Sequence, residues 1–221
     1  MSILLLGVFI VGVAIIAAQA AAGLYLVLLP GSDQTGAAVV GLVALQVTTI
    51  ILCLLVTLRE GPVVGLALTE PRVTAPDGAK VLGLTVGFIV VTTALAFTLF
   101  EEAYQRDIRT FAPFFANDLW WLAALSIMIG APVSEELLFR GLLLRRLEGA
   151  GVGFWAAAVV TCLMWTALHY GYSLIGLFEV FLAGLIMSWA LRVSGSVRLP
   201  ILIHCLYNSI AVGIMGFVLN Q

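Results

Sequence analysis

Charge is what this sequence has least of. Asp, Glu, Lys and Arg make up only 10% of its 221 residues, while hydrophobic residues make up 62% and the mean hydropathy is +1.17. A soluble globular domain usually carries about 25% charged residues, so this chain lacks the polar surface that a water-soluble body needs. The composition therefore excludes a soluble domain and predicts an integral membrane protein.

Other absences narrow the possible functions. The cysteines stand in apolar segments without the spacing of a metal site or of a disulfide framework, and they are only three: Cys53, Cys162 and Cys205. Lys and Arg nowhere form a basic cluster and the net charge is −2, so we expect no nucleic-acid partner. The sequence has no internal repeat and no low-complexity tract. The one partner that the composition itself implies is the lipid bilayer.

Apolar runs of about 20 residues, the length that a helix needs to span a bilayer, occur seven times. They are Ile3–Leu29, Gly36–Leu58, Lys80–Phe100, Leu119–Leu144, Val152–His169, Ile175–Leu191 and Leu199–Leu219. Turn-forming or charged stretches such as "PGSDQTG", "RRLEGAG" and "RVSGSVR" separate them. The sequence therefore predicts an all-α fold, a polytopic transmembrane helix bundle of about seven spans that forms one integral membrane domain over residues 1–221.

The positions of Lys and Arg predict the orientation, because the cytoplasmic loops of membrane proteins carry an excess of both. With seven spans, one face of the membrane collects most of these residues: Arg59, Arg72, Lys80, Arg145, Arg146, Arg192 and Arg198. The opposite face has Arg106 and Arg109, and Arg140 lies within a span. The N-terminus is therefore predicted to be cytoplasmic and the C-terminus to be outside.

The pattern Glu-Glu-x-x-x-Arg occurs twice, in "FEEAYQRD" from Phe100 to Asp107 and in "SEELLFRG" from Ser134 to Gly141. The first copy ends the third span and runs into polar and aromatic sequence, so its charges can reach water at the interface. The second copy has the apolar stretch "LWWLAALSIMIGAPV" before it and "GLLL" after it. Ionisable groups inside a span are costly and mark function by default. We therefore interpret the first copy as a solvated helix end and the second as the candidate site.

Helix geometry separates the two glutamates of the second copy. Glu136 and Arg140 are four residues apart and share a helix face, so they can form an ion pair. Glu135 is rotated by about 100° from its neighbour and remains available for proton transfer. A plainer alternative is that Pro132 and Ser134 begin a new helix whose N-terminal dipole attracts both acids, but a helix start would not require the arginine.

The only two histidines of the chain are the partners that we expect for Glu135. His169 ends "WTALH", and His204 lies in "HCLYN", where Asn208 follows one turn later on the same helix face. At about 1.5 Å per residue, Glu135 and His204 lie roughly 15 and 9 Å from the cytoplasmic ends of their helices. The sequence therefore predicts a catalytic cavity between the fourth, fifth and seventh spans.

Three further features have lower weight. His169 reaches the required depth only if the sixth span is shortened, and Gly171 and Gly176 suggest a non-helical stretch there. Glu179 is a lone acid in the sixth span, and we leave it out of the site. Cys205 could be a nucleophile, but adjacent residues diverge on a helix, and a buried thiol without an activating cation is usually inert.

Together these residues resemble the motifs of the CAAX protease and bacteriocin-processing family of intramembrane endopeptidases, which includes the Ras-converting prenyl-protein endopeptidase of eukaryotes. The family pattern is Glu-Glu-x-x-x-Arg, then Phe-x-x-x-His, then His-x-x-x-Asn, and it matches "EELLFRG", "WTALH" and "HCLYN" over about residues 119–214. Trp165 stands where the family usually has Phe. We expect this exchange of one bulky aromatic residue for another to matter little.

The resemblance implies an intramembrane endopeptidase with four catalytic and two supporting residues: Glu135, His169, His204 and Asn208, with Glu136 and Arg140. Glu135 would be the general base that activates water, and the first histidine would assist it. The second histidine and the asparagine would form the oxyanion hole, and the Glu–Arg pair would hold the site together.

We expect no metal and no other cofactor. The His-Glu-x-x-His pairing of many zinc peptidases is absent, and the positive charge of Arg140 disfavours a dication beside the acids. A zinc-dependent membrane endopeptidase that uses the same residues stays open as an alternative. So do a transporter, although no repeat symmetry is visible, and a membrane binding or immunity protein without enzymatic activity.

The expected substrate is a peptide or protein that reaches the site from the cytoplasmic side or laterally from the membrane. The resemblance places the chain in the cytoplasmic membrane of a bacterium or an archaeon. Prenylated CAAX proteins are substrates of the eukaryotic branch, so the resemblance leaves open whether this substrate is prenylated.

Overall fold

The computed structural model describes residues 2–219, and over this range the chain forms helices without any strand. In chain order they are α1 (Ile3–Leu28), α2 (Gln34–Val56), α3 (Pro62–Gly65), α4 (Ala75–Leu99), α5 (Glu101–Arg109), α6 (Ala112–Phe115), α7 (Trp120–Leu125), η1 (Ser126–Gly130), α8 (Ala131–Glu136), η2 (Leu137–Leu144), α9 (Arg145–Gly149), α10 (Phe154–Ala167), α11 (Leu174–Ser194) and α12 (Arg198–Leu219). The segments η1 and η2 are π-helical. The predicted all-α transmembrane bundle is confirmed.

Six helices in the described part of the chain are long and apolar enough to cross a bilayer. One is the continuous helix Trp120–Gly149, which joins α7, η1, α8, η2 and α9, so Pro132 and Ser134 lie inside a helix and do not begin one. The predicted fifth span, α10, has 14 residues and a length of about 21 Å at 1.5 Å per residue. The prediction of about seven spans is close to this arrangement, with one helix shorter than expected.

Capping residues explain where two of the long helices begin. Thr74 caps α4, because its hydroxyl oxygen accepts a hydrogen bond from the Asp77 N–H at 3.3 Å, and the helix therefore starts before the predicted Lys80. Ser173 caps α11 in the same way, accepting from the Gly176 N–H at 3.1 Å. The far end of α11 stops at Gly195, whose φ of +65° lies in the left-handed region that favours glycine.

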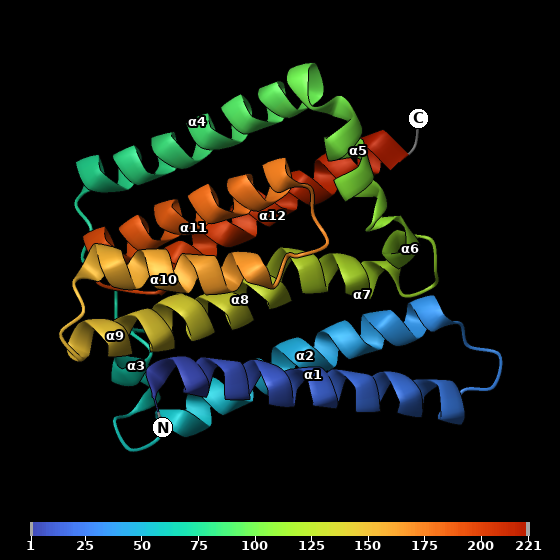
Figure 1. The fold of residues 1–221 in the computed structure, drawn as a ribbon, viewed down its shortest axis with the longest axis horizontal. Coiled ribbons are helices and arrows are strands. Elements are labelled where there is room, and N and C mark those ends of the chain that lie inside the picture. Colours follow the sequence, from blue (N-terminus) through green and yellow to red (C-terminus); the bar gives the residue numbers. More distant parts are fainter. Residues whose placement is uncertain (1, 220–221) are drawn as a thin grey trace.

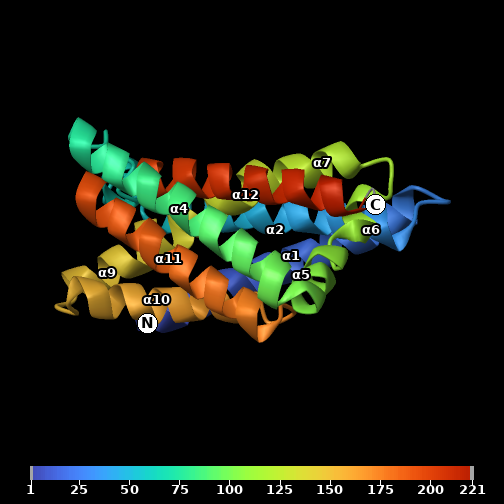
Figure 2. The ribbon, with the colours of Figure 1, turned by 90° about the horizontal axis from the view of Figure 1, so that it is seen from above.

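The long helices lie side by side along the longest dimension of the molecule (Figure 1). α1 and α2 pair on one side, α4 lies on the opposite side, and the helix Trp120–Gly149 lies between them with α10, α11 and α12. α3, α9 and the start of α12 mark one end, which carries most of the arginines and which we call the arginine-rich end. α5, α6 and the C-terminal end of α12 mark the other, which we call the α5 end (Figures 1 and 2).

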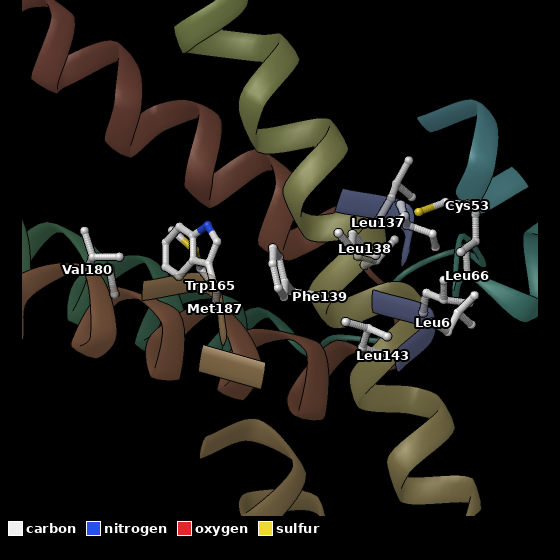
Figure 3. Close-up of a cluster of buried hydrophobic side chains, with 14 residues drawn as sticks. Leu6, Cys53, Leu66, Leu137, Leu138, Phe139, Leu143, Trp165, Val180 and Met187 are labelled. Carbon is white, nitrogen blue, oxygen red and sulfur yellow. The ribbon is translucent and has the colours of Figure 1, made fainter. Parts of the chain in front are cut away.

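The polarity of surface and interior is that of a membrane protein. Large apolar side chains such as Val27 and Phe217 are mostly exposed, at 76% and 67% of their surface, whereas Glu136 and Arg140 are fully buried. A cluster of buried apolar side chains packs beside the buried charges and includes Phe139 from η2 (Figure 3). The chain therefore presents apolar surface to its surroundings and concentrates polar groups inside.

Candidate active site

The second copy of Glu-Glu-x-x-x-Arg lies where α8 meets η2, in the interior of the bundle. Arg140 Nη1 donates to Glu136 Oε1 at 3.0 Å, so the ion pair expected from the four-residue spacing is present. Arg140 Nη2 donates to the carbonyl oxygen of Gly184 in α11 at 3.1 Å. Because any Cβ at residue 184 would lie 2.8 Å from that nitrogen, only glycine gives the guanidinium this space.

His204 of α12 faces both glutamates. Its Nδ1 lies 2.9 Å from Glu136 Oε1, and its Nε2 lies 4.0 Å from Glu135 Oε2. The imidazole is almost completely buried. The depth argument from the sequence therefore brought together the correct two helices, and a single histidine links the two adjacent carboxylates.

Glu135 differs from its neighbour in exposure. A quarter of its side-chain surface is accessible, whereas that of Glu136 is fully buried. Its Oε2 accepts a hydrogen bond of 2.6 Å from the indole N–H of Trp165, and the side chain lines a cavity. The rotation between the two residues thus places one carboxylate against arginine and the other at the cavity wall.

His169 follows α10 in the turn formed by residues 168–173, and it also lines the cavity. Its Nδ1 lies 3.0 Å from the backbone oxygen of Trp165, and no hydrogen bond joins it to Glu135 within residues 2–219. The expected non-helical stretch is present and contains Gly171. Gly176, which we expected in the same stretch, lies inside α11.

Asn208 lies one turn after His204 on α12, and both side chains line the cavity. The amide Nδ2 of Asn208 donates to the backbone oxygen of Ile127 in η1 at 2.8 Å. This bond fixes the amide against the helix that carries the glutamates. The structure therefore holds the asparagine at the cavity wall by a contact that the sequence could not show.

The cavity has a volume of about 640 Å³ and is wider than the predicted space between the fourth, fifth and seventh spans. Side chains of α2, α4, α11 and the α5–α6 segment also line it. The reason is that α5 and α6 fold back across the end of the bundle, where the sequence suggested only a solvated helix end. The lining residues extend from the depth of Glu135 to the α5 end, and none belongs to the arginine-rich end.

The helix α5, which carries the first copy of Glu-Glu-x-x-x-Arg, contributes to this cavity through residues that follow the two glutamates. Asp107 of α5 is buried, and its carboxylate accepts from the backbone N–H of Ser173 at 2.9 Å and from the hydroxyl of that residue at 2.6 Å. These bonds tie α5 to the start of α11. In the same turn, burial and then the negative charge of Glu135 raise the pKa of Tyr172 far above its ordinary value, so its hydroxyl stays protonated at neutral pH.

Sequence reasoning missed three features of the site. The indole N–H of Trp165 bonds the candidate base, although we expected this aromatic exchange to matter little. Glu179, which we left out, lines the cavity and accepts hydrogen bonds of 2.8 Å from Thr92 and from Tyr207. The π-helical segments η1 and η2 flank the glutamates, and such segments are frequent at functional sites. Of the three, the lone acid in a span and the tryptophan in place of phenylalanine were visible in the sequence, and we gave neither of them weight.

No group of three or more His, Cys, Asp or Glu side chains in the described part of the chain is placed to hold a metal ion. The fold and the site define a polytopic membrane protein with a buried Glu–Arg–His cluster beside the partly exposed carboxylate of Glu135. Residues 117–210 match the family model described as type II CAAX prenyl endopeptidase Rce1-like. The match confirms the family resemblance over this segment, which holds all the candidate site residues.

A protein of Escherichia coli, named only as an uncharacterised 24.3 kDa protein, is 42% identical over 85 residues. The alignment covers 38% of this chain and 39% of that relative, so the shared region spans well under half of either protein. No solved structure matches the chain.

Proposed function

We propose that the protein is an intramembrane endopeptidase that hydrolyses a peptide bond of a membrane-associated protein or peptide. The observation that carries the proposal is the position of Glu135, a partly exposed carboxylate on a cavity wall, beside a buried cluster of Glu136, Arg140 and His204. The family match over residues 117–210 supports a peptidase, because its description is that of a prenyl endopeptidase.

In this proposal, Glu135 is the general base. It takes a proton from a water molecule, the hydroxide attacks the carbonyl carbon of the substrate, and a proton then passes to the leaving amine as the C–N bond breaks. Trp165 occupies one of about four lone-pair positions of the carboxylate, so it leaves others for water. Glu136 is fully buried and paired, and it therefore has a supporting role.

His169 assists the base from the opposite side of the water. A carbonyl oxygen can only accept, so the Nδ1 of this ring donates to Trp165. In the neutral ring, Nε2 is then an acceptor. We place the attacking water between this nitrogen and Glu135, because both residues line the cavity without a direct bond to each other.

His204 and Asn208 stabilise the oxyanion. The amide of Asn208 has two N–H donors, and the bond to Ile127 uses one of them. The Nδ1 of His204 donates to Glu136, so Nε2 can donate to an oxyanion only in the doubly protonated ring. With Glu135 ionised and the ring protonated in the active form, the rate should have a bell-shaped dependence on pH.

The cavity also bears on how the substrate enters. We predicted access from the cytoplasmic side or laterally, yet the cavity extends toward the α5 end, which lies outside if the N-terminus is cytoplasmic. We therefore propose lateral entry of the substrate from the membrane, with water entering at the α5 end. Cytoplasmic entry through this cavity would require the reverse orientation.

Thiol labelling tests the orientation. Asp118 is exposed in the loop between α6 and α7 at the α5 end, and Gly149 is exposed at the arginine-rich end. In a cysteine-free background, Asp118→Cys should react with an impermeant reagent from outside and Gly149→Cys only from the cytoplasm. The opposite result would place the N-terminus outside and restore cytoplasmic access.

Comparison of peptide termini tests the activity. Membranes that contain the wild-type protein should yield new N-termini that are absent from membranes with Glu135→Gln, which removes the base and nearly preserves its shape. If both membranes yield the same termini, the protein is not an endopeptidase that uses this residue, and a binding, immunity or transport function becomes the better proposal.

A second test addresses the zinc alternative. Because Arg140 is fixed one turn from the acids, we propose a metal-independent reaction, since its charge opposes a dication there. Purified protein treated with a strong chelator should keep its cleavage rate. Loss of activity that stoichiometric zinc restores would convert the glutamates and histidines from base and oxyanion roles into metal ligands.

A further inference from the structure

We infer that Trp165 is the positioning residue of this site, which holds the base and fixes the tautomer of its assisting histidine. The inference rests on the proposed function for what these groups do, but the contacts themselves are independent of it. Trp165 lies on α10, one turn before His169, and only 3% of its surface is exposed.

The indole ring reaches the candidate base directly. Its Nε1–H donates to Glu135 Oε2 over 2.6 Å, which is short for a hydrogen bond between nitrogen and oxygen. Indole nitrogen is a donor only, so it cannot compete with Glu135 for a proton. The bond therefore orients the carboxylate and stabilises its ionised form without taking part in proton transfer.

The backbone of the same residue sets the tautomer of His169. The carbonyl oxygen of Trp165 accepts from Nδ1 at 3.0 Å, which leaves the Nε2 of the neutral ring as an acceptor. The two rings also meet edge to face, with centroids 5.3 Å apart. A shift of Trp165 would therefore move the carboxylate and the imidazole together.

The other face of the site constrains the indole in turn. The guanidinium carbon of Arg140 lies 4.5 Å from the ring centroid of Trp165, a cation–π contact, and His204 packs edge-on with centroids 5.3 Å apart. The ring is therefore wedged between the buried ion pair and both histidines.

Trp165 has an indole N–H, whereas the phenylalanine that the family usually has at this position has no hydrogen-bond donor. Phenylalanine would preserve the aromatic packing against Arg140 and the histidines, but it has no donor for Glu135. In this chain the exchange adds one contact, the hydrogen bond to the candidate base, that the expectation of little effect did not take into account.

The first measurement is the pH dependence of kcat/KM for purified Trp165→Phe against the wild type. Because the lost N–H contacts the group that is proposed to take the proton from water, the acidic limb of the profile should move, whereas loss of packing alone would lower the whole profile without moving it. Trp155→Phe, which replaces an exposed tryptophan of the same helix, should reproduce the wild-type profile. Superimposed profiles of Trp165→Phe and wild type would overturn the inference.

A second measurement does not depend on cleavage. The ¹H–¹⁵N spectrum of the wild type should contain an indole signal that disappears in Trp165→Phe and that moves with pH as Glu135 titrates. In Glu135→Gln the same signal should no longer follow pH. If it titrates in the same way in both proteins, the indole does not hold this carboxylate. If it behaves as expected while no substrate is cleaved, the proposed function fails and the contact stands.

Discussion

The two copies of Glu-Glu-x-x-x-Arg have the same residue pattern but differ in burial and in ion pairing. In the first copy, on α5, Glu101 and Glu102 are exposed, and no ion pair joins Glu102 to Arg106 in the described chain. In the second, Glu136 and Arg140 have the same spacing, are fully buried and form an ion pair of 3.0 Å. A pattern therefore predicts chemistry only together with the polarity of the segment in which it stands.

The two copies differ in their partners because their charged groups lie in different surroundings. At the start of α5, water and the helix dipole satisfy the acids, so they need no fixed partner. Inside the bundle, an unpaired charge would cost several kcal/mol, so arginine, histidine and a backbone carbonyl converge on the second copy. Burial is what converts the second copy into an organised site.

The largest expected difference between the copies is in activity. Glu135→Gln should lower kcat by roughly 10²- to 10⁴-fold, the usual contribution of a general base, because the amide cannot accept the proton from water. Glu101→Gln is the matched control and should keep wild-type kcat within about twofold. Both rates are measured with purified protein on one peptide substrate. The reverse ranking would mean that the exposed copy is the functional one.

The next effect is on stability. Arg140→Met should lower the free energy of unfolding by about 3–5 kcal/mol, because it leaves Glu136 as an uncompensated buried charge. Arg106→Met, at the same place in the exposed copy, should change it by less than about 0.5 kcal/mol. Unfolding in mixed micelles at increasing SDS measures both. Equal losses of stability in the two variants would show that burial does not make the Glu136–Arg140 pair more important for stability.

A smaller change tests the space around the buried pair. Gly184→Ala adds a Cβ within 2.8 Å of Arg140 Nη2 and 3.1 Å of Trp165 Cε3, and such overpacking usually costs about 1–3 kcal/mol. Gly213→Ala, where nothing lies within 4 Å of the added atom, should instead be neutral or stabilising by up to about 1 kcal/mol. The same SDS titration compares them. A neutral Gly184→Ala would show that the guanidinium can move.

The smallest effect concerns the exposed copy itself. Glu102→Gln should cost only about 0.3–1 kcal/mol, the usual benefit of an acid in the first turn of a helix. Because salt screens exposed charges, this cost should shrink as salt is raised in the SDS titration. A salt-independent loss larger than that of Arg140→Met would contradict the comparison.

Hydropathy predicted the positions of the spans because bilayer thickness constrains the length of apolar runs. The helix ends were less predictable, since caps such as Thr74 and Ser173 lie outside those runs. The segment of α5 and α6 was missed as a wall of the cavity. Its attachment depends on Asp107, which looked like one more exposed acid and instead accepts two hydrogen bonds from Ser173.

The parts of the site that depend on the spacing of residues along a helix could be predicted from the sequence. Four-residue intervals gave the Glu136–Arg140 pair, and the comparison of depths within the membrane gave the approach of His204 to Glu135. The contacts of Trp165 could not be derived, because the direction of an indole N–H depends on how α10 packs. The roles of the site residues stay predictions until the variants are measured.

The shortness of α10 has a consequence for the lipid. A helix of 14 residues, about 21 Å long, does not match a hydrocarbon layer of about 30 Å. The turn of residues 168–173 therefore ends short of the level reached by neighbouring helices (Figure 1), and a bilayer usually accommodates such a short helix by local thinning. Because the turn after α10 carries His169 beside the cavity, we expect the proposed cleavage to respond to the acyl-chain length of the surrounding membrane.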